Sequence, residues 1–220
     1  MPKAGVLVKR KTFGSTLWQD IAKNGSKKTK NSDFAKPAKV QIRKNVLAAI
    51  GEPAVVLDLF AGAGEMFQSV YKNAATDYVG CDLEWPRDDR LIYVCDNRRL
   101  MRAIDLGRFN VFDLDHYGSP WEHVMLLAKR RPVESGERLG VVITEGSNFK
   151  VRMGGLPAAL QRLAGLKSGM AGAGGKHDEI IEMALAGMCE YWGVRILRRW
   201  HARSKTGSHM RYIGMVVEGR

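Results

Sequence analysis

The amino-acid sequence predicts an α/β fold in which a parallel sheet is covered by helices on both faces. From residue 54 onward, short apolar strands alternate with helical segments, which is the pattern of βαβ units. The first strand runs directly into a glycine turn, and the last two strands are joined by a basic turn. We expect the strands at 54–60, 78–83, 91–94, 109–115, 139–145, 194–201 and 210–217.

Length and composition indicate one domain with an extension. The chain has 220 residues, of which 45% are hydrophobic, enough for a sizeable core. It contains no run of about 18 apolar residues, so we expect no transmembrane helix. The three cysteines form no CxxC pair, which favours reduced thiols, a cytoplasmic location and no metal site.

Basic charge is concentrated at the two chain ends. Residues 1–50 contain twelve Lys/Arg and two Asp/Glu, and residues 195–220 contain seven Lys/Arg and one Glu. Clustered basic residues attract phosphate backbones, although a solubilising tail is the alternative interpretation. We therefore divide the chain into a basic N-terminal extension with short helices, 1–50, and a main domain, 51–220. A helix opened by Pro37 and ending at Ile50 is expected to present four basic residues mainly to solvent: Lys36, Lys39, Arg43 and Lys44.

The glycine turn after the first strand predicts a ligand that lies against the backbone. Gly62 and Gly64 lack a Cβ, and a helix is expected to begin just beyond them. Asp58 precedes them at the strand end, where it could meet the ammonium group of S-adenosylmethionine and would repel a pyrophosphate. Phe67 occupies the third glycine position of the dinucleotide motif. These details favour S-adenosylmethionine over another nucleotide or an ordinary tight turn.

Further acids fall at successive strand ends, where α/β sheets bind ligands. Asp82 lies about 20 residues beyond the glycines, at a position where a carboxylate can accept both hydroxyls of a ribose. Asp96 could meet the adenine amino group, and Asn97 could offer its backbone N–H. Each acid could instead cap a helix.

Residues 113–120, Asp-Leu-Asp-His-Tyr-Gly-Ser-Pro, predict the acceptor side of the site. Methylation of an exocyclic base nitrogen needs acceptors for the amino hydrogens and a surface that holds the base. Asp115, with nearby backbone carbonyls, suits the first task and Tyr117 the second. His116 is either a general base or a partly buried structural histidine.

Over residues 54–217 the chain resembles the class I S-adenosylmethionine-dependent methyltransferases. It resembles them in the strand–glycine turn and in the Rossmann-like, mostly parallel seven-stranded sheet closed by an antiparallel hairpin. The turn is similar to Asp-Leu-Phe-Ala-Gly-x-Gly of nucleic-acid methyltransferases. The loop 113–120 resembles Asp-x-Asp-Pro-Phe/Tyr-Gly-Ser-Pro of the tRNA guanosine N2-dimethyltransferase family, and it is related to Asp-Pro-Pro-Tyr of amino-methylating DNA enzymes. His116 replaces the usual proline. The tRNA family also carries a C-terminal RNA-binding domain, whereas this sequence ends after the last expected strand, so the resemblance is weak for tRNA as the substrate.

From the residues and this resemblance we expect S-adenosyl-L-methionine to be bound by Asp58, Phe60, Gly62, Gly64, Asp82, Asp96, Asn97 and Asp113. The catalytic residues are expected to be Asp115, His116 and Tyr117. Phosphates are expected to contact Lys36, Lys39, Arg43, Lys44, Arg198, Arg199, Arg203 and Lys205.

The leading hypothesis is methylation of an exocyclic base amine in nucleic acid. RNA is slightly favoured over DNA because of the Gly-Ser-Pro ending of the loop. One alternative is a methyltransferase acting on a protein or a small molecule. Another is a nucleic-acid-binding methyltransferase fold that no longer catalyses.

Overall fold

The computed structural model describes residues 35–84, 88–153, 155–167, 175–203 and 210–220. Its strands are β1 (Val55–Asp58), β2 (Asp77–Asp82), β3 (Ile92–Val94), β4 (Val111–Leu114), β5 (Arg138–Glu145), β6 (Val194–Arg203) and β7 (Arg211–Gly219). Its α-helices are α2 (Lys36–Ile50), α3 (Lys72–Ala74), α4 (Asn97–Ala103), α5 (Trp121–Arg130), α6 (Asn148–Arg152), α7 (Ala158–Leu163) and α8 (His177–Trp192). A π-helical turn, η1 (Phe67–Tyr71), precedes α3, and a 3₁₀ turn, η2 (Leu106–Arg108), precedes β4.

The seven strands form one sheet in the order β3-β2-β1-β4-β5-β7-β6. Five neighbouring strands, from β3 to β5, are parallel, whereas β7 runs antiparallel to both β5 and β6. The α/β class, the mostly parallel sheet and the closing antiparallel hairpin are therefore confirmed. The carboxyl ends of β2, β1 and β4 lie side by side, so residues that follow these strands share one edge of the sheet.

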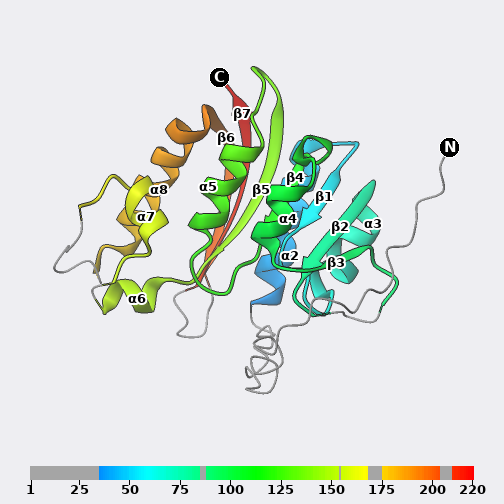
Figure 1. Ribbon diagram of the computed structural model, residues 1–220, viewed down its shortest axis with the longest axis horizontal. Helices are drawn as coiled ribbons and strands as arrows, with labels where there is room; N and C mark the ends of the chain where they lie inside the picture. Colours follow the sequence, from blue (N-terminus) through cyan, green and yellow to red (C-terminus); the bar gives the residue numbers. More distant parts are fainter. Residues whose placement is uncertain (1–34, 85–87, 154, 168–174, 204–209) are drawn as a thin grey trace. The chain divides into compact units, whose positions relative to one another are not determined.

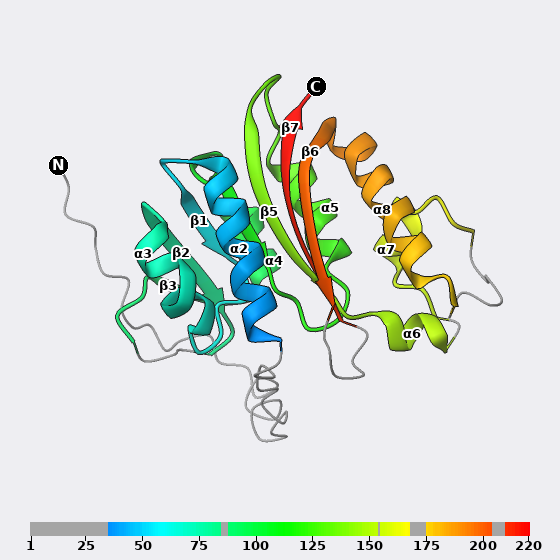
Figure 2. The same ribbon diagram turned by 180° about the vertical axis from the view of Figure 1, so that it is seen from behind.

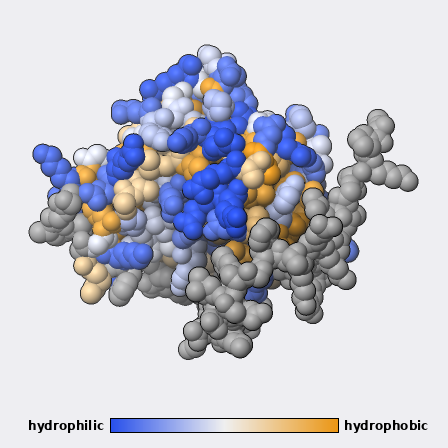
Figure 3. All heavy atoms as spheres, viewed as in Figure 1, coloured by the Kyte–Doolittle hydropathy of each residue, from blue (hydrophilic) through white to orange (hydrophobic). Residues whose placement is uncertain are grey.

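Helices cover both faces of the sheet. The views in Figures 1 and 2 show α4, α5, α7 and α8 on one face and α2 and α3 on the other. The larger apolar core lies under α4, α5, α7 and α8, and a second core lies under α2 and η1. The surface above the larger core combines hydrophilic areas with smaller apolar ones (Figure 3). No helix in the described part of the chain is long and apolar enough to cross a membrane.

Helix α2 is part of this layered packing. It lies close to β5 and β7, where a Cβ on Gly140 or Gly214 would come within 2.6 Å of an α2 side chain. Its buried positions follow the helical repeat of one face and are Lys39, Ile42, Arg43, Val46 and Leu47. The division at residue 50 that we expected from the sequence therefore places α2 in a different part of the chain from the sheet that it covers. Residues 1–34 of the expected extension lie outside the described residues.

After the first strand the sequence predicts a helix at about 64–74, and the structure is helical over 65–74. The middle of this segment is the π-helical turn η1, and its end is the short helix α3. Helix α6 was not predicted at all, because five residues are too few to show a helical repeat.

Candidate active site

The glycine turn connects β1 to η1 at the shared edge of the sheet. Gly62 and Gly64 both have positive φ, 45° and 84°, which other residues rarely adopt. The surroundings of the two glycines differ. Gly62 is exposed, and a Cβ there would meet only the carbonyl oxygen of Phe60, at 3.9 Å. Gly64 is buried, and a Cβ there would lie 2.7 Å from Cζ of Arg90. A ligand therefore has room beside Gly62, whereas the guanidinium group of Arg90 occupies the space beside Gly64.

The carboxylate of Asp58 is turned into the protein. It accepts hydrogen bonds from the Phe60 backbone N–H at 3.1 Å and from the Tyr78 hydroxyl at 2.9 Å, and the residue is 3% exposed. Burial and the adjacent charge of Asp113 raise the pKa of Asp58 to about 7. The expected direct contact between this carboxylate and an ammonium group is thus not supported, because both oxygens face internal donors. Asp58 instead shapes the turn through Phe60.

Asp82 joins the end of β2 to the glycine turn. Its Oδ2 accepts a hydrogen bond from the Gly62 N–H at 2.8 Å, and its Oδ1 accepts one from Glu84 at 3.0 Å. The next residue, Leu83, is 64% exposed. A carboxylate and an exposed apolar side chain therefore lie together beside Gly62, a combination that suits a sugar carrying a flat ring.

Asp96 and Asn97 lie after β3 and have structural partners. Asp96 caps α4 by accepting a hydrogen bond from the Arg99 N–H at 3.0 Å, which is the alternative role considered for it. The Asn97 side chain donates to the Leu59 carbonyl at 3.1 Å and contacts Nε2 of His123 at 2.9 Å. Asn97 thus ties the start of the glycine turn to α5 through its side chain rather than its backbone.

The loop after β4 is held against the loop after β5. The carbonyl of Gly118 accepts a hydrogen bond from the Gly146 N–H at 2.6 Å. Next to it, the Tyr117 side chain is 75% exposed, as a stacking surface requires. The His116 ring packs edge-on against Phe60, with centroids 5.0 Å apart, and burial lowers the pKa of His116. Phe60 therefore links the glycine turn to the loop after β4, and the lowered pKa of His116 favours its uncharged imidazole.

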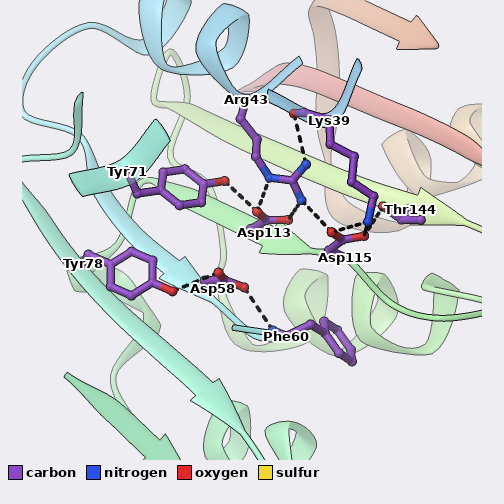
Figure 4. A network of polar contacts seen from close by, with 9 residues as sticks. All are labelled: Lys39, Arg43, Asp58, Phe60, Tyr71, Tyr78, Asp113, Asp115 and Thr144. Carbon is purple, nitrogen blue, oxygen red and sulfur yellow. Dashed lines mark hydrogen bonds and ion pairs between the residues drawn. The ribbon is translucent and has the colours of Figure 1, made fainter. Parts of the chain in front are cut away.

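Asp113 and Asp115 lie in a buried ionic network with α2 (Figure 4). They are two residues apart along the strand direction and so face the same side of the sheet. Arg43 donates through Nε to Asp113 at 2.6 Å and through Nη2 to both carboxylates, at 2.9 and 3.1 Å. Lys39 donates to both oxygens of Asp115, at 2.9 and 2.8 Å. The Tyr71 hydroxyl donates a hydrogen bond to Asp113 at 2.6 Å, and the Thr144 hydroxyl donates one to Asp115 at 2.6 Å.

This network corrects four expectations. Lys39 and Arg43 are 6% and 0% exposed, so they do not face solvent and are not placed to contact phosphates. Asp113 is 0% exposed and paired with Arg43, so it does not face a cofactor. Both oxygens of Asp115 already accept hydrogen bonds from Lys39, Arg43 and Thr144, which does not suit the expected contact of its carboxylate with a base amine.

The basic residues of the hairpin divide between two faces. Arg199 and Arg203 form ion pairs with Glu182 and Asp178 of α8, both at 2.6 Å. Arg198 is exposed, and its strand alternation places it on the α2 face of the sheet. On α2, Lys44 is exposed and Lys36 is half-buried, while Lys205 lies outside the described residues.

The sequence interpretation missed Arg90 and the two tyrosines, Tyr71 and Tyr78. Arg90 follows a run of charged residues and resembles an ordinary surface arginine. The sequence contains one indication of its role, since Asp88, a possible ion-pair partner, lies two residues before it. Across the part of the chain that the structure describes, no group of three or more His, Cys, Asp or Glu residues could hold a metal ion.

Comparison with solved structures identifies the fold. Trm1 from Pyrococcus horikoshii, in complex with S-adenosyl-L-methionine, aligns with a TM-score of 0.58 and 17% identity over 86% of this chain and 56% of that chain. TYW2 from M. jannaschii, in complex with AdoMet, has a TM-score of 0.53 and 12% identity over 88% and 80% of the two chains. The N-methyltransferase NodS from Bradyrhizobium japonicum WM9, in complex with S-adenosyl-L-homocysteine, has a TM-score of 0.52 and 9% identity over 92% and 96%.

No protein-family model and no curated protein sequence matches this chain. The solved structures show that the chain has the fold of class I S-adenosylmethionine-dependent methyltransferases. It spans only about half of the Trm1 chain, 56%.

Proposed function

We propose that this protein is an S-adenosylmethionine-dependent methyltransferase that methylates an exocyclic base amine in nucleic acid. One observation carries the proposal. The glycine turn after β1, Asp82 at the end of β2 and the acceptor loop after β4 lie at the carboxyl ends of three adjacent parallel strands. This edge is where open α/β sheets bind their ligands.

The donor half of the site fits S-adenosylmethionine. Gly62 offers open space against backbone, Asp82 offers a carboxylate for the ribose hydroxyls, and Leu83 offers an exposed apolar surface for adenine. Asp96 and Asn97 follow β3, the strand beside β2, and the Asn97 side chain donates to the Leu59 carbonyl at the start of the glycine turn. When bound, the cofactor supplies a reactive sulfonium methyl group, so the protein contributes mainly by orienting the acceptor.

The acceptor half fits a flat base bearing an amino group. The exposed Tyr117 ring provides a stacking surface. Main-chain carbonyl groups of the loop would accept hydrogen bonds from the amino hydrogens of the base. An amine nitrogen that received the cofactor's methyl group would have to lose a proton. Burial lowers the pKa of His116 and so favours its uncharged form, which would accept this proton and pass it to solvent. Asp115 supports the loop from beneath through Lys39 and Arg43.

Charge supports nucleic acid as the substrate. The chain carries a formal net charge of +12, with the excess at its two ends. Arg198, Lys36 and Lys44 lie on the α2 face, so we infer that phosphates approach from that side. Arg199 and Arg203 contribute less, because α8 carboxylates already neutralise them. RNA remains slightly favoured over DNA on the loop motif.

Two measurements test the proposal. Calorimetry with S-adenosylmethionine should show binding that Asp82→Ala weakens and that Asp77→Ala, an exposed acid at the start of the same strand, leaves unchanged. Transfer of a tritiated methyl group should then be measured in parallel on total tRNA, ribosomal RNA and unmethylated DNA, with nucleoside digestion of the product. Labelling of a base amine in one polymer is the expected result. Binding without labelling of any polymer would contradict the nucleic-acid proposal and favour a protein or small-molecule acceptor or a non-catalytic fold.

A further inference from the structure

Arg90 reaches from the loop between β2 and β3 to the underside of the glycine turn. It is 8% exposed, and its guanidinium group donates through Nη1 to the Ala61 carbonyl at 3.0 Å and through Nη2 to the Gly62 carbonyl at 2.8 Å. Asp88 accepts a hydrogen bond from its Nε at 2.8 Å, and the group lies over the Phe67 ring at 5.8 Å from the centroid. Asp88 and Phe67 thus hold the guanidinium group in place while it donates to two consecutive carbonyl groups of the turn.

We propose that Arg90 is a positioning residue that sets the conformation of the glycine turn for cofactor binding. A planar guanidinium group can hold two neighbouring carbonyls at once, which a lysine ammonium cannot do with the same geometry. With the carbonyls of Ala61 and Gly62 turned toward Arg90, their partial negative charge is directed at this cation. The N–H of Gly62 is fixed separately by Asp82. Both peptide groups that flank Gly62 are therefore oriented before any ligand arrives.

Gly64 follows from the same arrangement. A Cβ at this position would lie 2.7 Å from Cζ and 3.0 Å from Nε and Nη1 of Arg90. A side chain at this position would therefore displace the Arg90 guanidinium group, and the positive φ of 84° favours glycine as well. Of the two glycines in the motif, Gly62 faces the ligand side and Gly64 faces Arg90. The inference rests on the proposed function for the identity of the ligand, but the contact itself does not depend on it.

The first test compares S-adenosylmethionine affinity by calorimetry in Arg90→Ala, Arg90→Lys and the control Arg108→Ala. Arg108 is an exposed arginine whose ion pair with Asp77 lies away from the turn. We expect about a tenfold or greater loss for Arg90→Ala, incomplete recovery for Arg90→Lys and no change for Arg108→Ala. Amide hydrogen exchange of residues 61–66 should accelerate in Arg90→Ala while exchange in α8 stays unchanged. Equal affinity in all three variants overturns the inference.

A second test needs no ligand. The shift in urea midpoint caused by Gly64→Ala should be larger in the wild type than in the Arg90→Ala background, because only the wild type retains the clash. Additive shifts would show that Arg90 does not occupy this space. If Arg90→Ala does not fold, Asp88→Asn replaces it in the calorimetry and exchange experiments. We then expect a smaller loss of S-adenosylmethionine affinity, and an unchanged affinity would count against the proposal. Failure of the wild type to bind S-adenosylmethionine would refute the proposed function, while the midpoint and exchange results would still decide the role of Arg90.

Discussion

Replacing Arg43 by methionine tests whether the buried network holds the site together. Arg43 is completely buried and donates to Asp113 at 2.6 and 2.9 Å and to Asp115 at 3.1 Å. Methionine fills a similar volume with an adaptable apolar chain, so the change removes charge more than packing. Asp115 keeps Lys39, but Asp113 is left with the Tyr71 hydroxyl as the remaining donor of this network.

The expected loss follows from leaving a buried carboxylate without its cation. Removing one partner of a buried ion pair destabilises a protein by about 3–5 kcal/mol. In a domain of this size each kcal/mol lowers the melting temperature by about 2–4 °C, which gives a decrease of about 6–20 °C. Urea unfolding followed by tryptophan fluorescence measures the same change, because Trp121 and Trp192 are buried.

Two matched variants make the result specific. Lys44→Met changes an exposed basic residue on the next position of the same helix and should alter stability by no more than about 0.5 kcal/mol. The double variant Arg43→Met with Asp113→Asn removes both charges and should recover much of the loss. A single variant that loses less than about 1 kcal/mol, or a double variant no more stable than the single one, would refute this reasoning.

Four further predictions concern single features of the site. Because burial raises the pKa of Asp58 to about 7, its carboxyl group favours folding most below about pH 4, and this contribution is lost as the pH rises through 7. The effect is at most about 4 kcal/mol, and Asp58→Asn should flatten the stability curve between pH 4 and 7; a curve as steep as that of the wild type would contradict it. Lys39→Met leaves Arg43 on Asp115 and should reduce stability by about 1–3 kcal/mol, less than Arg43→Met, with methyl transfer decreasing and S-adenosylmethionine affinity unchanged. Tyr117→Ala should leave stability within about 0.5 kcal/mol but weaken nucleic-acid binding by about 1–3 kcal/mol, with Tyr117→Phe as the control. Finally, a chain beginning at residue 33 should unfold cooperatively, whereas one beginning at residue 51 should not, since it lacks α2.

The strands could be predicted because their signal is local. Short apolar segments ended by acids or glycines gave seven strands, and the parallel order follows from the helices between them. Helix α8 has an equally local signal. The apolar repeat of residues 178–192 predicts a helix, and the structure has one at His177–Trp192, with Gly193 in the left-handed conformation just past its end.

The ion-pair partners of Lys39 and Arg43 could not be predicted from α2 alone. At about 100° per residue both lie within the arc of its apolar positions Val40, Val46, Leu47 and Ile50, so the helical repeat indicates burial, and the expectation of exposure came from their charge. Their partners lie about 70 residues away, in the carboxylates of Asp113 in β4 and Asp115 just after it. A helical pattern that counts apolar residues cannot detect such a pairing, because neither partner is apolar and neither is near the other in sequence.

The same pairing explains why the acids at the strand ends were assigned too uniformly. Asp58 and Asp113 are register partners on β1 and β4, and Asp115 follows two residues later on the same face. Asp113 and Asp115 share Arg43 of α2, whereas Asp58 accepts hydrogen bonds from Tyr78 and Phe60 (Figure 4). Three carboxylates in a buried layer are tolerable only if cations or hydroxyl donors accompany them. Lys39 and Arg43 supply the charge, and Tyr71, Tyr78 and Thr144 supply hydroxyl hydrogens. Asp82, by contrast, lies at the end of β2, where its carboxylate accepts a hydrogen bond from the Gly62 N–H.

The strand-end acids therefore divide by depth. Asp58 and Asp115 belong to the buried group. Asp58 accepts a hydrogen bond from the Phe60 backbone, Asp115 directly precedes His116, and the rings of Phe60 and His116 are in contact. These carboxylates therefore hold the glycine turn and the loop after β4 relative to each other. The methyl transfer that we propose would need its donor and acceptor held in line, since a misplacement of about 1 Å can cost about 100-fold in rate. A buried ionic layer spanning both strands can provide that rigidity, whereas exposed acids that turn toward each ligand separately cannot.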